Sequence, residues 1–404
     1  MATLSMFGGR HGSTAIVMAA KIVHLGKYYP PHKGGMETHL QGLVSGMRGL
    51  YGIDVLVAND RAHTKIEHLD GARIRRVPTF GTLASMPLTP TLPFELWRSH
   101  ADLVHVHTPN PGAAFALAVS GYRGPLIITH HSDTLGRKHL NQLSAPFVRR
   151  MMQNADAIIA TSERYLNSSG ELAPHAKKCY VIPLGLGKAA FRPARSEEIQ
   201  RVRERLGRRL VLAVGRLVEY KGFIYLLHAM KQLDATLAIV GTGPQASTLE
   251  RLAHELNIRG RVHFLGHVEE LAPYLAAAEV FALPSISRAE AFGMVQLEAM
   301  AAGLPVVNTN IESAVPEISI HGKTGWTVPP RDPAALAKAL NSLLENGEMR
   351  LQMGRDARAR AAKEFSAESI NSRTVTLYEA VLRARGSLGK RSRNRECLFD
   401  SVLK

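Results

Sequence analysis

Cysteine is scarce in this sequence. Its 404 residues include only Cys179 and Cys397. The two are far apart and lack the close spacing of zinc modules or small disulfide-rich domains, so the sequence indicates neither kind of site. This sparing use of cysteine favours a reducing compartment.

Long apolar runs and aromatic residues are also missing. No stretch of about 18 apolar residues is present, so we expect no transmembrane helix. Aromatic residues make up 6% of the chain, and no basic run is interleaved with aromatics, so we expect no nucleic-acid partner. Residues 1–19 lack a compact apolar core of signal-peptide length. We interpret them as a disordered extension, with Met18 an alternative start of translation.

Acidic residues are outnumbered, with 34 Asp+Glu against 50 Lys+Arg and a net charge of +16. Nucleic acid, an anionic membrane surface and diphosphate ligands could each explain such a balance. We favour the membrane and predict a cytoplasmic protein held peripherally on the inner face of the cell membrane. Residues 135–152 form a predicted amphipathic stretch with Arg149 and Arg150, and a solvated helix face is the simpler alternative.

The length and the pattern predict two α/β domains. Single cores rarely grow past about 250–300 residues, and short apolar runs alternate here with helical patterns along the chain. The run LAIVGTGP at 237–244 is only part of the G-x-G-x-x-G fingerprint, so we reject a nicotinamide cofactor.

One stretch, residues 281–308 (FALPSISRAEAFGMVQLEAMAAGLPVVN), carries the strongest local signal. It predicts a strand, a loop, a helix and a second strand, which places the start of the helix at the carboxyl end of a sheet. The backbone N–H groups of Gly293, Met294 and Val295 would be free at that start. Such a helix N-terminus suits an anion, most often a phosphate.

Two carboxylates, Glu290 and Glu298, bracket that helix start. Eight helical residues rise about 12 Å, so the two are too far apart for an adjacent acid/base pair. They could contact opposite ends of one extended ligand. The simpler alternative makes Glu290 a partner of the helix dipole and Glu298 a solvated helical residue.

Other charged and small residues follow predicted strands. Arg216 and Lys221 lie in a strand-to-helix loop and suit a diphosphate, although a basic surface loop is a common alternative. In the first half of the chain, Gly34 and Gly35 allow a close approach of backbone to a ligand, although any tight turn uses glycine.

Histidines also follow predicted strands in the first half of the chain. A predicted buried strand at 126–129 delivers His130 and His131 to its carboxyl end, where ligands meet open α/β sheets. A pair of loop histidines held by Asp133 is the structural alternative. The alternating histidines of residues 103–107 are predicted to line one face of a strand end.

The string E-A-F-G-x-x-x-x-E-A-M-A-x-G-x-P-V-V resembles the nucleotide-sugar site of the retaining glycosyltransferases of family 4, which have the GT-B fold. The segment G-R-x-x-x-x-K-G resembles the second motif of that family. The resemblance spans nearly all of residues 20–385. It implies an α/β fold in which two Rossmann-like domains face each other across a cleft.

By the same resemblance, Arg216 and Lys221 neutralise the departing diphosphate of the donor. Glu290 binds the sugar hydroxyls and favours positive charge at the anomeric carbon, while Glu298 holds the ribose hydroxyls. His131, favoured over its neighbour by its register, contacts the donor sugar, and we predict Glu290 and His131 as the catalytic residues. The remaining predicted donor-binding residues are Gly34, Gly35, Val268, Phe292, Gly293, Met294 and Val295.

The predicted domain organisation follows from the resemblance and the pattern together. The final helix is expected to cross back to the first domain. The predicted segments are a disordered extension (1–19), an N-terminal acceptor-side domain (20–190), a C-terminal nucleotide-sugar domain (191–366), the returning helix (367–385) and a basic tail (386–404).

The reaction implied is transfer of a hexose, with retention, from a nucleotide sugar to a growing, lipid-linked glycan. The segment 131–186 looks like bacterial O-antigen and exopolysaccharide mannosyl- or rhamnosyltransferases, so GDP-mannose is the preferred donor. We expect no cofactor beyond that co-substrate and, since no Asp-x-Asp motif is present, no metal. The alternatives are a UDP-hexose donor, a nucleotide-sugar epimerase or phosphorylase, and a non-catalytic basic adaptor.

Overall fold

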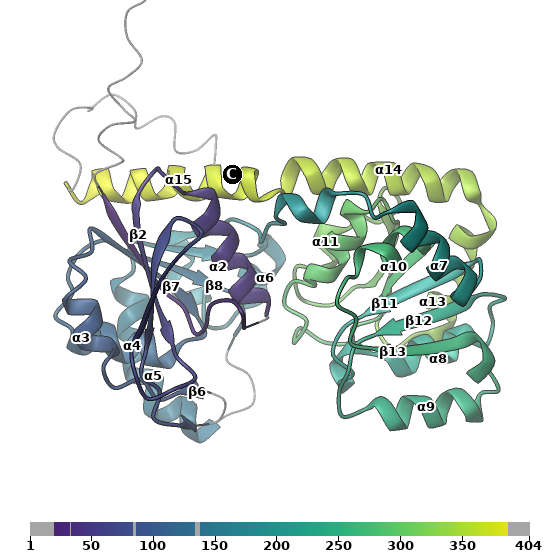
Figure 1. The fold of residues 1–404 in the computed structure, drawn as a ribbon, viewed down its shortest axis with the longest axis horizontal. Coiled ribbons are helices and arrows are strands. Elements are labelled where there is room, and N and C mark those ends of the chain that lie inside the picture. The colour runs from purple at the N-terminus through teal and green to yellow at the C-terminus, as the bar shows by residue number, and fades with distance from the viewer. Residues whose placement is uncertain (1–19, 33, 84–85, 134–137, 387–404) are drawn as a thin grey trace, which may run out of the picture. The chain divides into compact units, whose positions relative to one another are not determined.

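The computed structural model describes residues 20–386, except 33, 84–85 and 134–137. The predicted extension 1–19, nearly all of the predicted tail and Arg137 of the basic stretch lie outside the described residues. The described chain divides into two compact units. Unit 1 runs to Ala160 and adds Gly170–Ile182 and the described part from Asn371, whereas unit 2 comprises Thr161–Ser169 and Pro183–Ile370. Each unit is an α/β structure with its own sheet (Figure 1).

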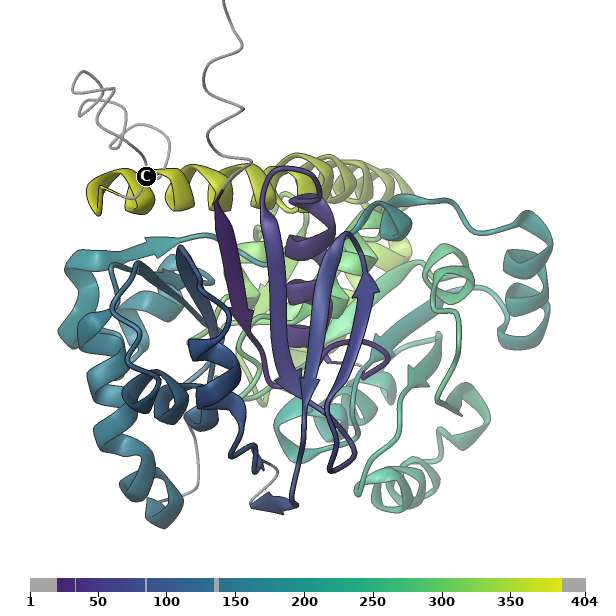
Figure 2. The same cartoon turned by 60° about the vertical axis from the view of Figure 1, so that its left-hand side comes forward.

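Unit 1 is built on an eight-stranded sheet in the order β10-β9-β8-β7-β1-β2-β4-β3. All neighbours are parallel except the β3–β4 pair. Figure 2 shows its first strands side by side in purple and dark blue. Its main strands are β1 (Lys21–Leu25), β2 (Gly52–Ala58), β3 (Lys65–Leu69), β4 (Ala72–Val77), β7 (Leu103–Thr108), β8 (Leu126–His130), β9 (Ala157–Ala160) and β10 (Cys179–Val181), and β5 (Thr82–Leu83) pairs separately with β6 (Met86–Pro87).

The helices of unit 1 connect its strands, except for the last one, which follows the final strand of the chain. Their helical patterns end at proline, glycine or polar residues, as expected for surface turns. From Asn371 onward, α15 belongs to unit 1. These helices are α2 (Gly35–Gly46), α3 (Leu92–Trp97), α4 (Pro111–Val119), α5 (Lys138–Asn154) and α15 (Ala367–Ala384).

Unit 2 is built on a six-stranded parallel sheet in the order β13-β12-β11-β14-β15-β16. Alternate residues of its strands enter two separate cores, with Leu210 and Leu212 on one face and Val211 and Ala213 on the other. Both faces are therefore buried, which explains why the strands appear as continuous apolar runs. The strands are β11 (Leu210–Val214), β12 (Thr236–Val240), β13 (Val262–Gly266), β14 (Val280–Leu283), β15 (Val306–Thr309) and β16 (Gly325–Val328).

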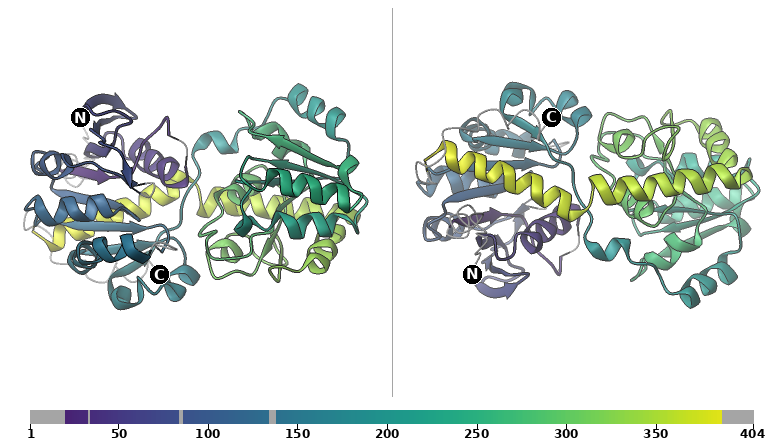
Figure 3. Two further views of the ribbon diagram at one scale, coloured as in Figure 1. Left: turned by 90° about the horizontal axis from the view of Figure 1, so that it is seen from below. Right: turned by 90° about the horizontal axis from the view of Figure 1, so that it is seen from above.

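The helices of unit 2 cover both faces of its sheet. Helix α14 packs on α11, and Figure 3 shows its yellow-green ribbon lying along the unit. The helices are α6 (Glu163–Ser168), α7 (Ser196–Leu206), α8 (Phe223–Met230), α9 (Ala246–Glu255), α10 (Ala272–Ala277), α11 (Met294–Ala301), α12 (Val315–Ile318), α13 (Pro333–Glu345) and α14 (Gly347–Glu364).

The fold class predicted from the sequence is confirmed, and the differences are local. The sequence patterns miss β3, whose KIEHL sequence is mostly exposed because the strand lies at the sheet edge. The apolar run at 179–185 (CYVIPLG), which predicts a strand, forms a strand only over the three residues of β10. None of the helices in the described part of the chain is long and apolar enough to cross a membrane.

Candidate functional site

The start of α11 is the centre of the candidate site in unit 2. The loop after β14 ends at Gly293, the N-cap of the helix, which has a φ of 76°. This left-handed conformation is unfavourable for residues with a side chain. A Cβ there would also lie 2.9 Å from the Leu283 side chain. Glycine thus lets the chain turn tightly into the helix and directs the first-turn N–H groups, including those of Met294 and Val295, out of the carboxyl end of the sheet.

A buried ion pair joins this loop to the loop after β11. The Lys221 ammonium contacts Glu290 Oε2, and the two residues are only 8% and 7% exposed. Ser285 Oγ donates a hydrogen bond to the same carboxylate oxygen at 3.1 Å. Glu290 is therefore an ion-pair partner rather than a cap of the helix. Burial by itself disfavours a charge on either group. The opposite charge of the partner compensates for that cost.

Glycine allows these two loops to approach closely. Gly222 has a φ of 69°, and a Cβ added to it would lie 2.0 Å from the Pro284 carbonyl oxygen. The side chain of Lys221 packs against Gly215, where an added Cβ would lie 3.1 Å from Nζ. Strands β11 and β14 are neighbours in the sheet, so the loops that follow them meet at the same edge.

Glu298 lies farther along α11 and is partly buried. Burial raises the pKa of its carboxyl group to about 6. Its partial burial does not fit the simpler interpretation of a fully solvated helical residue. A carboxylate that has lost water but has no ion-pair partner among the described residues is suited to accept hydrogen bonds from a ligand.

The other residues predicted to bind the donor differ in exposure. Arg216 is exposed on the β11 loop, while Val268 follows β13 and packs partly buried against the core. The Phe292 side chain is 4% exposed within that core, so only its backbone is available to a ligand. Arg216 is thus free to move toward a ligand, in contrast to the fixed Lys221.

A buried amide network supports the helix start, and sequence reasoning missed it. Gln296 Nε2 donates to the Val315 carbonyl at 3.3 Å. Asn308 Nδ2 donates to Gln296 Oε1 at 3.1 Å, and Thr327 Oγ1 donates to Asn308 Oδ1 at 2.8 Å. The sequence did contain a signal for this network, because Gln296 and Asn308 are polar residues within apolar runs. The network fixes α11 on β15 and β16.

In unit 1, Gly34 is the N-cap of α2 and Gly35 its first residue. The backbone of Gly34 is extended, with a φ of 178°, so conformation does not require glycine there. Space does not require it either, because the atom nearest to an added Cβ, Glu37 Oε2 at 2.2 Å, is the end of a flexible side chain. Gly35 has no heavy atom within 4 Å of an added Cβ. Both glycines are exposed, so their backbone is accessible, and their contact with a donor stays a prediction.

His131 belongs to unit 1 and ends a chain of buried imidazoles. His131 Nε2 lies 3.3 Å from His107 Nδ1, and His107 Nε2 lies 3.2 Å from His24 Nδ1. At the two ends, His131 Nδ1 and His24 Nε2 have no hydrogen-bond partner among the residues that the structure describes. Burial lowers the pKa of each ring, to about 3 for His24 and well below the usual value for the other two. All three imidazoles are therefore neutral.

The adjacent residues His130 and His131 have different surroundings. Whereas His131 joins the buried chain, His130 Nδ1 lies 2.8 Å from Thr108 Oγ1. His130 Nε2 is 3.5 Å from carboxylate oxygens of both Asp133 and Glu171. The alternative of a histidine held by Asp133 therefore describes His130 alone.

Two groups of side chains in unit 1 could hold a metal ion. The ligand atoms of each group lie within 4.8 Å of one another. In the first, both nitrogens of His105 already contact hydroxyls, with Tyr378 OH at 2.5 Å and Thr129 Oγ1 at 2.7 Å. The second combines one imidazole with two carboxylates, which suits a divalent cation better. The groups are His24 with His105 and His107, and His130 with Asp133 and Glu171.

Two Rossmann-like units, with a helix N-terminus and a buried Lys–Glu pair at the carboxyl edge of the second sheet, define a protein of the GT-B class. Residues 33–187 match the profile of Glycosyltransferase Family 4, and residues 194–360 match that of Glycosyl transferases group 1. The chain therefore belongs to this family of glycosyltransferases, as its motifs predicted.

Individual relatives agree with this assignment. The D-rhamnosyltransferase WbpZ of Pseudomonas aeruginosa is 33% identical over 86% of this chain and 92% of its own length. The O-antigen chain mannosyltransferase C of Escherichia coli is 29% identical over 90% of this chain and 100% of its own. The structure of Anabaena Alr3699/HepE in complex with UDP has a TM-score of 0.75 at 23% identity, covering 89% of this chain and 100% of that one. It shows the same fold.

Proposed function

We propose that this glycosyltransferase transfers a hexose, with retention of configuration, from a nucleotide sugar to a glycan acceptor in O-antigen type polysaccharide synthesis. The observation that carries the proposal is the buried contact of Lys221 with Glu290 beside the free first turn of α11. A fixed cation and free N–H groups stabilise a departing diphosphate without reorganisation. The adjacent carboxylate favours positive charge on the sugar left behind.

The names of the two curated relatives support a mannosyl or rhamnosyl reaction. We propose GDP-mannose as the donor and a lipid-linked glycan as the acceptor, with no cofactor. A UDP-hexose donor is the alternative for this chain. Within the described residues, both groups that could hold a metal lie in unit 1 and contain no predicted residue of the unit 2 site. Diphosphate charge is thus assigned to Lys221, Arg216 and α11, and transfer is expected to persist in a chelator.

A thermal-shift titration tests the donor first. A nucleotide at about 100 times its dissociation constant stabilises the fold by about 2.7 kcal/mol. We expect a shift with GDP and GDP-mannose that UDP and ADP do not match. Selective stabilisation by UDP would overturn GDP-mannose as the proposed donor but would leave the proposed transferase activity in place. The absence of a shift with every nucleotide would overturn the proposed function and favour the adaptor.

We also propose that unit 1 docks on an anionic membrane face. Helix α3 packs on α4, which packs on α5. Phe94 and Trp97 of α3 are 53% and 60% exposed, and Leu143 of α5 is 76% exposed. The guanidinium of Arg98 lies over the Phe94 ring at 5.4 Å. Exposed aromatic and basic side chains together are typical of membrane-interface helices.

Vesicle sedimentation tests the docking. Trp97→Ala should weaken binding to anionic vesicles, and salt should weaken binding of the wild type, because screening reduces the electrostatic attraction. Leu351→Ala is the control, since it removes a 62% exposed side chain of α14 in unit 2. Binding that is insensitive to both salt and Trp97→Ala would contradict a membrane-docking face.

A further inference from the structure

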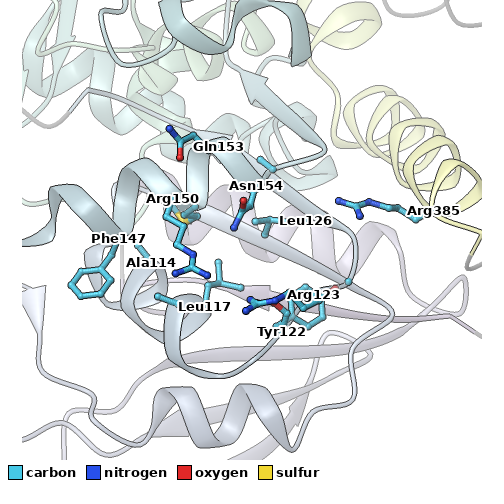
Figure 4. A pocket seen from close by; sticks show the side chains of 14 residues that line it. Ala114, Leu117, Tyr122, Arg123, Leu126, Phe147, Arg150, Gln153, Asn154 and Arg385 are labelled. Atoms are coloured by element: carbon cyan, nitrogen blue, oxygen red, sulfur yellow. The ribbon is translucent and has the colours of Figure 1, made fainter.

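A cavity in unit 1 lies at the edge of the sheet opposite to His131. It has a volume of about 520 Å³. The C-terminal halves of α4 and α5 form one wall, and the segments that precede β8 and β9 form the other (Figure 4). His131 follows the carboxyl end of β8, whereas this cavity lies at the amino end. It is therefore distinct from the candidate site.

The cavity is strongly basic. Its lining includes Arg123, Arg150 and Arg385 but no Asp or Glu. Arg385 Nε contacts Asp156, just outside the lining, at 2.7 Å. No described carboxylate pairs with Arg123 or Arg150, whose guanidinium groups turn toward the same space in Figure 4. Arg123 Nη1 donates to the Tyr122 carbonyl at 3.3 Å, which leaves its charge uncompensated. Two guanidinium groups without a described carboxylate partner, on one cavity, form a site for an anion.

The wall formed by α4 and α5 is mixed. Leu117 and Phe147 belong to its apolar part, whereas Arg150, Gln153 and Asn154 of α5 are polar. The Phe147 ring meets Phe115 edge-on, with centroids 5.3 Å apart. Phe115 and Val119 are 44% and 54% exposed beside the cavity. An apolar strip thus continues outward from the basic floor, so the complementary ligand has an anionic head and an apolar tail.

We propose that this cavity binds the headgroup of an anionic phospholipid. Arginine forks match phosphate oxygens, and the volume falls in the range of about 300–1,000 Å³ that suits organic ligands rather than a lone inorganic phosphate. The acyl chains lie along Phe147 and Phe115. The site thereby gives unit 1 a stoichiometric lipid contact, in addition to the diffuse attraction of its membrane face. The proposal does not depend on the donor or on transfer.

Calorimetric titration with short-chain lipids below their micellar concentration tests the site. Dihexanoyl phosphatidylglycerol should bind saturably at about one per chain. The Arg123→Gln/Arg150→Gln double variant should bind it about tenfold or more weakly, since it loses both of these guanidinium groups. Both side chains are exposed, so the fold is expected to persist, which a thermal melt checks.

Matched controls separate this site from general charge. The control is the Arg149→Gln/Arg355→Gln double variant, which removes the same charge. Arg149 is next to Arg150 in α5, and Arg355 is exposed on α14. This variant should change the affinity for the lipid less than about twofold. Equal weakening by both double variants would overturn a defined site. If glycerol phosphate binds as tightly as dihexanoyl phosphatidylglycerol, the ligand is a soluble phosphate ester and not a lipid. If dihexanoyl phosphatidylcholine binds as tightly, the cavity does not select an anionic headgroup.

The double variant also separates this proposal from the proposed function. The cavity shares no residue with the candidate site in unit 2, so the thermal shift of the variant with GDP should match that of the wild type. Loss of lipid binding together with an unchanged thermal shift with GDP would support the lipid site independently of the proposed function. Unaltered lipid binding in the variant would overturn the proposed lipid site, whatever the thermal shift with nucleotides.

Discussion

The two units handle buried ionisable groups in opposite ways. In unit 1, burial lowers the pKa of His24 to about 3 and that of His39 to about 4, so the imidazoles lose their charge. In unit 2, Lys221 and Glu290 are comparably buried but contact each other. A buried group without a counter-charge becomes neutral, whereas a buried pair retains both charges.

The difference matches the chemistry proposed for each unit. In the proposed function, a diphosphate would need a fixed cation, a role that we assign to Lys221. The predicted role of His131 is contact with a sugar hydroxyl, for which a neutral ring would serve. Its Nδ1 has no hydrogen-bond partner among the described residues but is buried, so a ligand would reach it only if neighbouring atoms moved.

Breaking the ion pair should have the largest effect. We expect Glu290→Ala to lower turnover by about 10²–10⁴-fold, as for loss of a group that acts in the transition state. It should also destabilise the free protein by about 3–5 kcal/mol, because it leaves the buried Lys221 ammonium without a partner. Initial rates and thermal melts measure the two effects.

Glu270→Ala, which removes an exposed carboxylate of unit 2, is the matched control for this variant. Nucleotide binding by Glu290→Ala should remain measurable, since Lys221 stays available for the diphosphate. Turnover equal to that of the control would refute the catalytic role of Glu290.

The neutral histidines should make the fold sensitive to acid. Their folded pKa values lie below the usual 6.5, so the unfolded chain binds more protons below about pH 6.5. Their contribution to stability is present above that pH and is lost as pH falls toward about 3–4. Each such histidine adds a slope of about 1.4 kcal/mol per pH unit in this window.

Urea unfolding at several pH values between about 7.5 and 5 measures that slope. His39→Phe removes one buried imidazole, 6% exposed, and should make the slope shallower. His254→Gln removes an exposed histidine of α9 and serves as the control. A wild-type stability that does not change over this range would show that the buried rings do not stay neutral.

Forcing the two loops of unit 2 apart should have a smaller effect. Gly222→Ala places a Cβ where the Pro284 carbonyl oxygen is only 2.0 Å away, so the loop that holds Lys221 must move. Gly49→Ala has a similar φ of 78° but no atom within 4 Å, so it reports the left-handed penalty alone, about 1–2 kcal/mol. We expect Gly222→Ala to lower the free energy of unfolding further and to weaken GDP binding. Equal effects of both substitutions would count against close loop contact.

The smallest expected effect comes from Glu298. Its folded pKa of about 6 lies above the usual 4.5, so the folded state binds more protons between these values and stability falls as pH rises through them. Above about pH 6 the ionised group costs at most about 2 kcal/mol. Glu298→Gln should therefore raise the melting temperature at about pH 7.5 while weakening nucleotide binding. A variant that is more stable and binds GDP as well as the wild type would exclude the residue from the site.

Local sequence patterns were enough to predict the parts of the site that lie in single loops. The strand–loop–helix pattern around Gly293 predicted the free helix start, because one glycine in a left-handed turn decides it locally. The same holds for Lys221, which lies in the loop that follows β11. The direct contact of Lys221 with Glu290 was not predicted, since it depends on β11 and β14 being neighbours.

The histidine chain could not be predicted from any single segment. Its members come from β1, from β7 and from the residue after β8, which become neighbours only in the sheet order β8-β7-β1. Parallel register then sets His24 beside His105. The choice between the doubled histidines also needed the fold, because successive residues point to opposite sides of a strand.

The sequence by itself thus determined the family, the α/β architecture and the residues that surround the start of α11, because these depend on short-range patterns of glycine, charge and apolar residues. The tertiary structure decided which of the ionisable residues are charged. Protonation depends on burial and on the distance to a partner, and both are set by strands that are remote in the chain.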